Sequence, residues 1–329
     1  MTTRQSYAPG SAKKVKSMTQ TTTRQDAAER IKQRQLETDL VRAPKGYWQS
    51  VWEIVRRDKL TMGASGLLLL IALLCFVLAA PLSNALDIDP NDTDPLIAFE
   101  GPSPEHPMGV DQVGRDQLAR LLYGGRVSIG IGFFAAFIIM TLGMTVGSMA
   151  GFYGGAADDL IMWFINTLNS IPFILLLLIV SLLFKPNATT LTVFIGLISW
   201  TDISRIVRGQ VLQVKEMEYI TAARATGVPT RGLILRHVLP NVIPVVIIFS
   251  AQVIGGVILV ESALSFLGLG VQPPTATWGN MLNKAQSYFT LAPHLVLWPG
   301  MLITITVLCL YVIGDGLRDA LDPTMRGAR

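Results

Sequence analysis

Residues 215–241 read KEMEYITAARATGVPTRGLILRHVLPN, a charged stretch between two long apolar runs. Its first part favours an α-helix up to Thr226, because it is rich in alanine and its acidic residues come early, where the helix dipole prefers them. Gly227 ends this helix, and Pro229 cannot continue it. A second short helical stretch follows and is expected to stop at Pro240. The stretch therefore predicts two helices joined by a glycine turn, a structured loop suited to docking against another protein.

The same stretch resembles the cytoplasmic EAA loop of ABC-importer permease subunits. That pattern is Glu-Ala-Ala, three residues, glycine, nine residues, isoleucine, any residue and then Leu-Pro. The spacing matches throughout, with Thr221 in place of the usual glutamate and His237 in place of the isoleucine. The resemblance implies a coupling helix that sits in a groove of an ATP-hydrolysing subunit, where Glu218 would substitute for the missing carboxylate. The residues expected to couple to the ATPase are Glu218, Thr221, Ala222, Ala223, Arg224, Gly227, Leu239 and Pro240.

The composition is that of a polytopic membrane protein. Of 329 residues, 50% are hydrophobic and 15% are charged, and the mean hydropathy is +0.46. The net charge of +4 does not indicate a nucleic-acid partner, because the basic residues cluster at the ends of apolar runs. Cys75 and Cys309 lie inside apolar runs and are interpreted as small core residues.

The pattern of apolar runs predicts an all-α protein with six transmembrane helices. Residues 1–60 are expected to form a basic tail, disordered to about residue 45, with an amphipathic helix that lies on the membrane or binds a partner. The further divisions are a first transmembrane helix over 61–82 that ends at Pro81, an external loop over 83–125 with a short amphipathic helix, a five-helix permease core over 126–317 that contains the coupling loop 213–240, and a C-terminal tail over 318–329.

Within the core, the second span is expected over about 126–151, and the Gly124-Gly125 pair is expected to stop the short helix before it. Gly143, Gly147 and Gly151 then form a smooth face, either for packing inside one bundle or for a homodimer seam. The other spans are expected over about 160–184, 190–211, 242–267 and 294–317. Pro172 predicts a kink in the third span that would free a carbonyl to face a pathway or a neighbouring helix.

The distribution of basic residues predicts the orientation. With six spans both termini share one side, and that side carries 22 of the 27 lysines and arginines, including those of the coupling loop. The positive-inside rule therefore places both termini and the coupling loop in the cytoplasm.

Three further stretches resemble the C-type permease of dipeptide, oligopeptide and nickel ABC importers: Met108 to Ser128, Glu261 to Leu282 and Gly314 to Pro323. The resemblance implies the type I ABC importer permease fold in a bacterial or archaeal inner membrane. It also implies four kinds of partner: a homologous second permease, two cytosolic ABC ATPases, an extracytoplasmic substrate-binding protein and membrane lipid. The cargo stays open among dipeptides, longer peptides, metal complexes and sugars.

The sequence predicts no cofactor, metal site or catalytic group. None of the nine lysines follows a glycine, as a P-loop requires, and the three histidines have no metal-binding spacing. Glu261 is the clear carboxylate inside an apolar run, and two interpretations stay open: a structural hydrogen bond to a neighbouring element, or a gate in the pathway. Two other classes of function are alternatives: a self-contained channel or secondary transporter, and an intramembrane hydrolase. The first would need intramembrane charges near the middle of the spans, where the sequence has few, and the second lacks a motif.

Overall fold

The computed structural model describes residues 47–184 and 187–321. The predicted basic tail up to residue 46 and most of the C-terminal tail lie outside these residues. The chain divides into two units, Met1–Glu53 and Ile54–Arg329. Residues 47–53 of the first unit begin the helix α2, Tyr47–Arg57, which occurs where the amphipathic helix is predicted.

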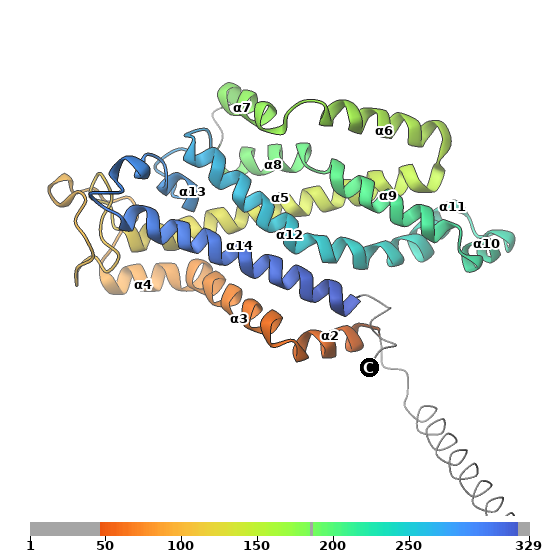
Figure 1. Ribbon diagram of the computed structural model, residues 1–329, viewed down its shortest axis with the longest axis horizontal. Coiled ribbons are helices and arrows are strands. Elements are labelled where there is room, and N and C mark those ends of the chain that lie inside the picture. The colour runs from red at the N-terminus through yellow and green to blue at the C-terminus, as the bar shows by residue number, and fades with distance from the viewer. Residues whose placement is uncertain (1–46, 185–186, 322–329) are drawn as a thin grey trace, which may run out of the picture. The chain divides into compact units, whose positions relative to one another are not determined.

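Every regular element in the described part of the second unit is a helix (Figure 1). In chain order they are α3 (Lys59–Leu73), η1 (Leu74–Leu78), α4 (Ala79–Leu86), η2 (Pro95–Ile97), α5 (Gln117–Tyr153), α6 (Gly155–Asn169), α7 (Phe173–Phe184), α8 (Ala188–Ile198), α9 (Thr201–Lys215), α10 (Glu218–Ala225), α11 (Thr230–Leu233), η3 (Ile234–Val238), α12 (Leu239–Phe266), α13 (Trp278–Met281), η4 (Ala285–Tyr288) and α14 (His294–Leu321).

Four of the helical stretches are long and apolar enough to cross a membrane. They are Lys59–Leu86, Gln117–Tyr153, Thr230–Phe266 and His294–Leu321. Two further candidates are bent pairs, α6 with α7 at 74° and α8 with α9 at 41°, which bring the number to six if each pair is one span. The expected all-α architecture is thus confirmed, and the stretches expected to be the third and fourth spans are each interrupted by a bend.

The first of these helices is longer than expected. Asp58 caps its start, and hydrogen bonds from the Thr61 hydroxyl and the Leu60 amide hold the pKa of Asp58 below its ordinary value. The helix continues to Leu86, so the predicted end at Pro81 and Leu82 is wrong. A π-helical turn over Leu74–Leu78 shifts the backbone hydrogen-bond pattern just before the proline, which allows its ring to be accommodated.

The helix α5 also differs from the prediction, because it runs unbroken through Gly124 and Gly125. The short helix before the second span and the span itself are therefore one element. Both glycines are buried, and a Cβ at Gly125 would lie 2.6 Å from the indole ring of Trp278. Glycine here permits close packing and does not end the helix.

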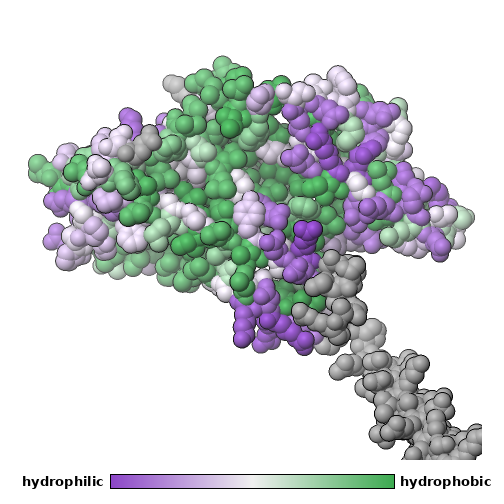
Figure 2. All heavy atoms as spheres, in the orientation of Figure 1, coloured by the Kyte–Doolittle hydropathy of each residue, from purple (hydrophilic) through white to green (hydrophobic). Residues whose placement is uncertain are grey.

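α5 is the central helix of the bundle. It packs against α8, α9 and α12, and α14 packs against α12 and α3 (Figure 1). Hydrophobic side chains cover the middle of the face in Figure 2, while hydrophilic ones gather at the end that carries α10. The helix α13 and the connections beside it lie at the opposite end from α10 (Figure 1).

The glycine face of α5 lies against α9. A Cβ at Gly143 would come within 2.7 Å of the Ile203 side chain, and one at Gly151 would come within 2.9 Å of the Arg208 carbonyl oxygen. Gly147 faces Ser204 and Val207 in the same way. The two backbones therefore approach as closely as glycine allows. We call this contact the α5–α9 seam.

Candidate functional site

The stretch that resembles the EAA loop contains a short helix with one buried side chain. Its helix, α10, has Ile220 as its one buried residue, and Ile220 joins a core cluster with Val214 of α9 and Val242 of α12. The other side chains of α10 are exposed or half-buried. One buried side chain therefore anchors the helix in the core, and most of its surface stays open.

Gly227 forms the turn that ends α10. It has φ +82°, and its amide donates to the Arg224 carbonyl oxygen at 3.1 Å. The Val228 amide donates to the Ala223 carbonyl oxygen at 3.2 Å, which completes a Schellman-type cap. A Cβ at Gly227 would meet no atom within 4 Å, so the position requires glycine for its backbone angle alone.

The second helix does not stop at Pro240, contrary to the prediction. α11, η3 and α12 form one helix from Thr230 to Phe266, and the π-helical turn Ile234–Val238 directly precedes the proline. Pro240 therefore falls in the first turn after a shift in hydrogen bonding, where its missing amide hydrogen costs little. The coupling segment is continuous with a candidate membrane span, and a displacement of one would move the other.

The residues of the coupling motif differ in exposure. Glu218, Thr221, Ala222, Arg224, Gly227 and Pro240 are exposed, while Ala223 and Leu239 are half-buried. The Asn241 amide nitrogen bonds the Tyr219 hydroxyl at 3.1 Å and the His237 carbonyl oxygen at 2.6 Å. Asn241 thus joins Tyr219 of α10 to the following helix, whereas His237 contributes a backbone carbonyl that any residue would supply.

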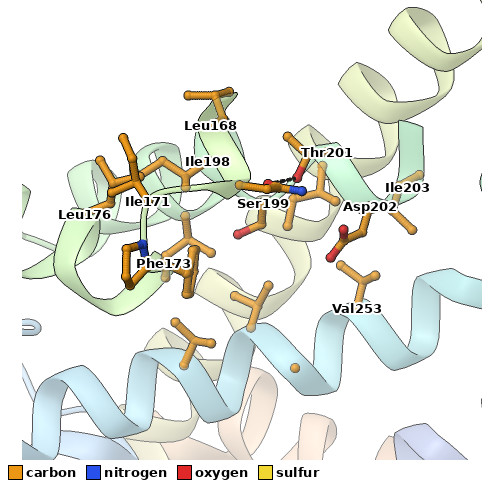
Figure 3. Close-up of a pocket in the computed structure, with 17 residues that line it drawn as sticks. Leu168, Ile171, Phe173, Leu176, Ile198, Ser199, Thr201, Asp202, Ile203 and Val253 are labelled. Carbon is orange, nitrogen blue, oxygen red and sulfur yellow. Dashed lines mark hydrogen bonds between the residues drawn. The ribbon is translucent and has the colours of Figure 1, made fainter. Parts of the chain in front are cut away.

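A second feature is a cavity of about 460 Å³ where the two bent pairs break (Figure 3). The α6–α7 break contributes Pro172, and the α8–α9 break contributes Ser199. Val253 to Val260 of α12 and Ile139 of α5 close the other sides. At Pro172 the predicted kink is a complete break with a bend of 74°. The break between α8 and α9, at Ser199 and Trp200, contains no proline or glycine, so no local sequence signal predicts it.

The cavity is apolar apart from a few polar groups near the breaks. Asp202 extends from α9 into the space above Val253 (Figure 3). Thr201 and Asn169 are joined by a hydrogen bond of 3.0 Å across the two breaks. Asp202 also pairs with Arg205 one turn later, but this contact is long, at 3.9 Å, and the Asp202 side chain is 82% exposed.

Polar contacts join α6 to α9 below the cavity. The Arg208 guanidinium donates two hydrogen bonds to Asp158, at 2.6 and 2.5 Å, and Arg205 donates to Asn166 at 2.8 Å. The Asp158–Arg208 pair was not predicted from the sequence. The two residues are 50 positions apart, and no local pattern relates a carboxylate to a guanidinium over that distance.

Glu261 lies apart from the cavity, near α13. It is fully buried and accepts hydrogen bonds from Ser265 at 2.8 Å and from Ser128 of α5 at 3.1 Å. Ser128 in turn accepts from the Trp278 amide at 3.1 Å. The carboxylate thus links α12, α5 and α13 through hydroxyl groups.

The described residues contain no group of three or more histidine, cysteine or acidic side chains that could hold a metal ion. Cys75 and Cys309 are buried free thiols on different elements.

Comparison with known proteins assigns the family. Residues 143–327 match the model of the binding-protein-dependent transport system inner membrane component. The chain is 39% identical to the oligopeptide transport system permease protein OppC of Escherichia coli (strain K12), over 84% of this chain and 93% of that one. It is 36% identical to the glutathione transport system permease protein GsiD of Pectobacterium atrosepticum, over 87% and 93%. With the dipeptide transport system permease protein DppC of Alkalihalophilus pseudofirmus it shares 36% identity, over 85% and 90%.

These relatives are transport permeases and not enzymes. The resemblance found in the sequence is confirmed: this multi-pass membrane protein belongs to the family of binding-protein-dependent transport system inner membrane components and is a permease subunit of an ABC importer.

Proposed function

We propose that this chain forms half of a membrane pathway for peptides or related small solutes and is driven through α10 by ATPase subunits. The observation that carries the coupling role is the exposure of α10. A helix of eight residues attached by the buried Ile220 and by the Tyr219–Asn241 hydrogen bond has few stabilising contacts within the chain, and short helices are marginal in water. A partner that covers the exposed face would supply the missing contacts.

The cavity at the two breaks is the part of the chain best suited to line the pathway. Irregular backbone at membrane depth is tolerated where it is buried in protein or lines a cavity, and transporters use broken helices at their binding sites. Pro172 and Asp202 line this cavity, one from each break. The peptide transporters among the relatives support a cargo with polar and apolar parts, which this lining can accept.

The proposed topology has six spans, with each bent pair crossing once and both termini in the cytoplasm. The excess of basic residues on that side supports it. α10 then faces the cytosol, while α13 and Glu261 lie toward the outside. The domain divisions of the sequence analysis carry over to this topology, with the first span extended to Leu86 and the second begun at Gln117.

The proposed partners are a homologous second permease, two cytosolic ATPases and an external binding protein. Closure of the ATPases on ATP would displace α10. Because the helix after it is continuous to Phe266, the displacement would tilt a span beside the cavity. Two states of the bundle, one biased by nucleotide and one by the loaded binding protein, would give alternating access.

The test is to solubilise the tagged chain gently from its native membrane, identify proteins recovered in near-equal amounts, and reconstitute the assembly for uptake of labelled peptides. We expect a second permease and P-loop ATPases in the assembly, and uptake that requires ATP. A matched preparation with Ile220→Ala is expected to keep the second permease but lose most of the ATPase. Peptide uptake by the isolated chain without ATP would contradict the proposal.

A further inference from the structure

A polar pocket of about 250 Å³ lies at the α13 end of the bundle, away from the cavity. Its walls come from the segment before α5, the first turn of α5, and the connections on either side of α13. Three basic side chains line it, those of Arg115, Arg120 and Lys284, and none of the lining residues that the structure describes is acidic. The transport function described above makes no use of this pocket.

The two arginines share one carboxylate, that of Asp111. One oxygen of Asp111 accepts from the Arg115 side chain at 2.7 Å and lies 3.5 Å from Nε of Arg120. The other oxygen accepts from the amides of Val113 at 2.9 Å and Arg115 at 3.0 Å. Both oxygens are therefore already engaged, and one negative charge faces two guanidinium groups.

Burial makes this imbalance costly. The Arg120 side chain is 4% exposed and that of Arg115 is 12% exposed. Arg120 has one further partner among the hydrogen bonds of the described residues, the Pro90 carbonyl oxygen at 3.1 Å, which is neutral. A charge removed from water without full compensation is destabilising, so an anion in the pocket would offset the cost.

The other polar groups in the pocket do not compete for an anion. The side-chain amides of Gln272, Asn280 and Asn283 donate to backbone carbonyl oxygens at 2.8 to 3.3 Å. The N–H groups of these side-chain amides are thus already bonded within the chain, so the charged side chains determine which ligand the pocket binds. Such a lining disfavours a cation and gives little to a neutral molecule.

We propose that this pocket binds a carboxylate group. Guanidinium groups match the planar geometry of a carboxylate, and the exposed Lys284 adds an ammonium group to the lining. The volume of about 250 Å³ holds one such group with a short stem. On the proposed function the carboxylate comes either from the solute, as the end of a peptide, or from an acidic side chain of the delivering protein.

The binding test uses the full chain in lipid nanodiscs and does not depend on transport. Amide hydrogen exchange of residues 109–123 and 265–285 is measured as sodium acetate replaces sodium chloride at constant ionic strength. Acetate is expected to slow exchange in the wild-type chain, whereas acetamide, which has the same shape without the charge, is not. Lys284→Gln should weaken the apparent acetate affinity about three- to fivefold, and Lys284→Arg should keep it.

Equal effects of acetate and acetamide, or an unchanged affinity in Lys284→Gln, would overturn the proposal. Lys284 is exposed, so neither variant is expected to impair folding. If the chain binds acetate but the assembled transporter takes up no peptide in the presence of ATP, the proposed function is overturned and the pocket assignment stands.

The assembled transporter then separates the two sources. If the solute supplies the carboxylate, Lys284→Gln lowers uptake of a peptide with a free carboxyl end more than uptake of its amidated form. If the delivering protein supplies it, both uptakes fall equally, and stimulation of ATP hydrolysis by the loaded protein weakens. Unchanged uptake and unchanged stimulation would overturn both sources and the assignment of a functional carboxylate site.

Discussion

The α5–α9 seam and the turn after α10 both depend on glycine, but for opposite reasons. In the seam a Cβ at Gly151 would lie 2.9 Å from the Arg208 carbonyl oxygen, so the neighbouring backbone leaves no room. At Gly227 a Cβ would meet no atom within 4 Å, yet φ is +82°. The first glycine is required by packing inside the chain. The second is required by backbone conformation, on a surface with space left beside it.

This difference distinguishes a region that stabilises the permease from the region proposed to connect it to the ATPase subunits. Buried apolar residues of α5 and α9 support the seam, and the Asp158–Arg208 pair holds α9 to α6. α10 has one buried side chain. Substitutions in the seam should therefore change the stability of the chain, whereas substitutions at α10 should chiefly change coupling.

Gly147→Ala is expected to give the largest loss of stability. Its Cβ would lie 2.9 Å from Cβ of Val207 and closer still to the Ser204 carbonyl oxygen. Overpacking against backbone should lower the free energy of unfolding by about 2–3 kcal/mol, measured by reversible unfolding in mixed micelles. Gly130→Ala is the matched control on the same helix, because a Cβ there meets no atom within 4 Å. The control should be neutral or slightly stabilising, and equal losses in the two variants would contradict the seam.

Glu261→Leu is expected to cost about 2 kcal/mol, because it leaves the buried hydroxyls of Ser128 and Ser265 without their acceptor. Glu261→Gln keeps an acceptor oxygen and should stay near wild type in stability and in assembly with the second permease. Uptake distinguishes the two interpretations of this residue. If Glu261→Gln also transports normally, the gate hypothesis is wrong and the structural one stands.

The Asp158–Arg208 pair is expected to show a coupling energy of about 1–2 kcal/mol in a double-mutant cycle with Asp158→Asn and Arg208→Gln. Its two short hydrogen bonds and the partial burial of both groups are the reason. The same cycle on Asp202 and Arg205 is the control. That pair is exposed and 3.9 Å apart, so its coupling should stay below about 0.5 kcal/mol. Similar coupling energies in both cycles would contradict the claim that the Asp158–Arg208 pair stabilises the α6–α9 contact more than an exposed ion pair would.

Gly227→Val is expected to give the smallest loss of stability, about 1 kcal/mol, from backbone strain at positive φ. ATP-driven uptake should nevertheless fall while the ATPases remain bound, because the turn that orients α10 is distorted. Gly227→Asn is the matched control, since asparagine tolerates this conformation. Normal uptake by the valine variant would rule out the assigned role of the turn.

The sequence was sufficient for the helical class, the family and the turn at Gly227, because apolar length and a glycine cap are local properties. It was insufficient where tertiary packing determines where a helix ends or which residues meet. Pro81 and Pro240 do not end helices, since π-helical turns precede them. Gly124 and Gly125 do not stop α5. They are glycines because α13 packs too closely against them to leave room for a side chain. The break at Ser199 has no local sequence signal. The Asp158–Arg208 pair joins residues that are distant in sequence, so a local pattern does not predict it.

The most direct test of the coupling role is photocrosslinking in native membranes from two exposed positions at opposite ends of the bundle. A photoreactive amino acid replaces Ala222 in α10 or, as the control, Leu96 in the loop before α5. We expect position 222 to form an adduct with a P-loop ATPase, and position 96 to form none. Recovery of the ATPase from position 96, or its absence from position 222 while it co-purifies with the chain, would contradict both the coupling role of α10 and the proposed orientation.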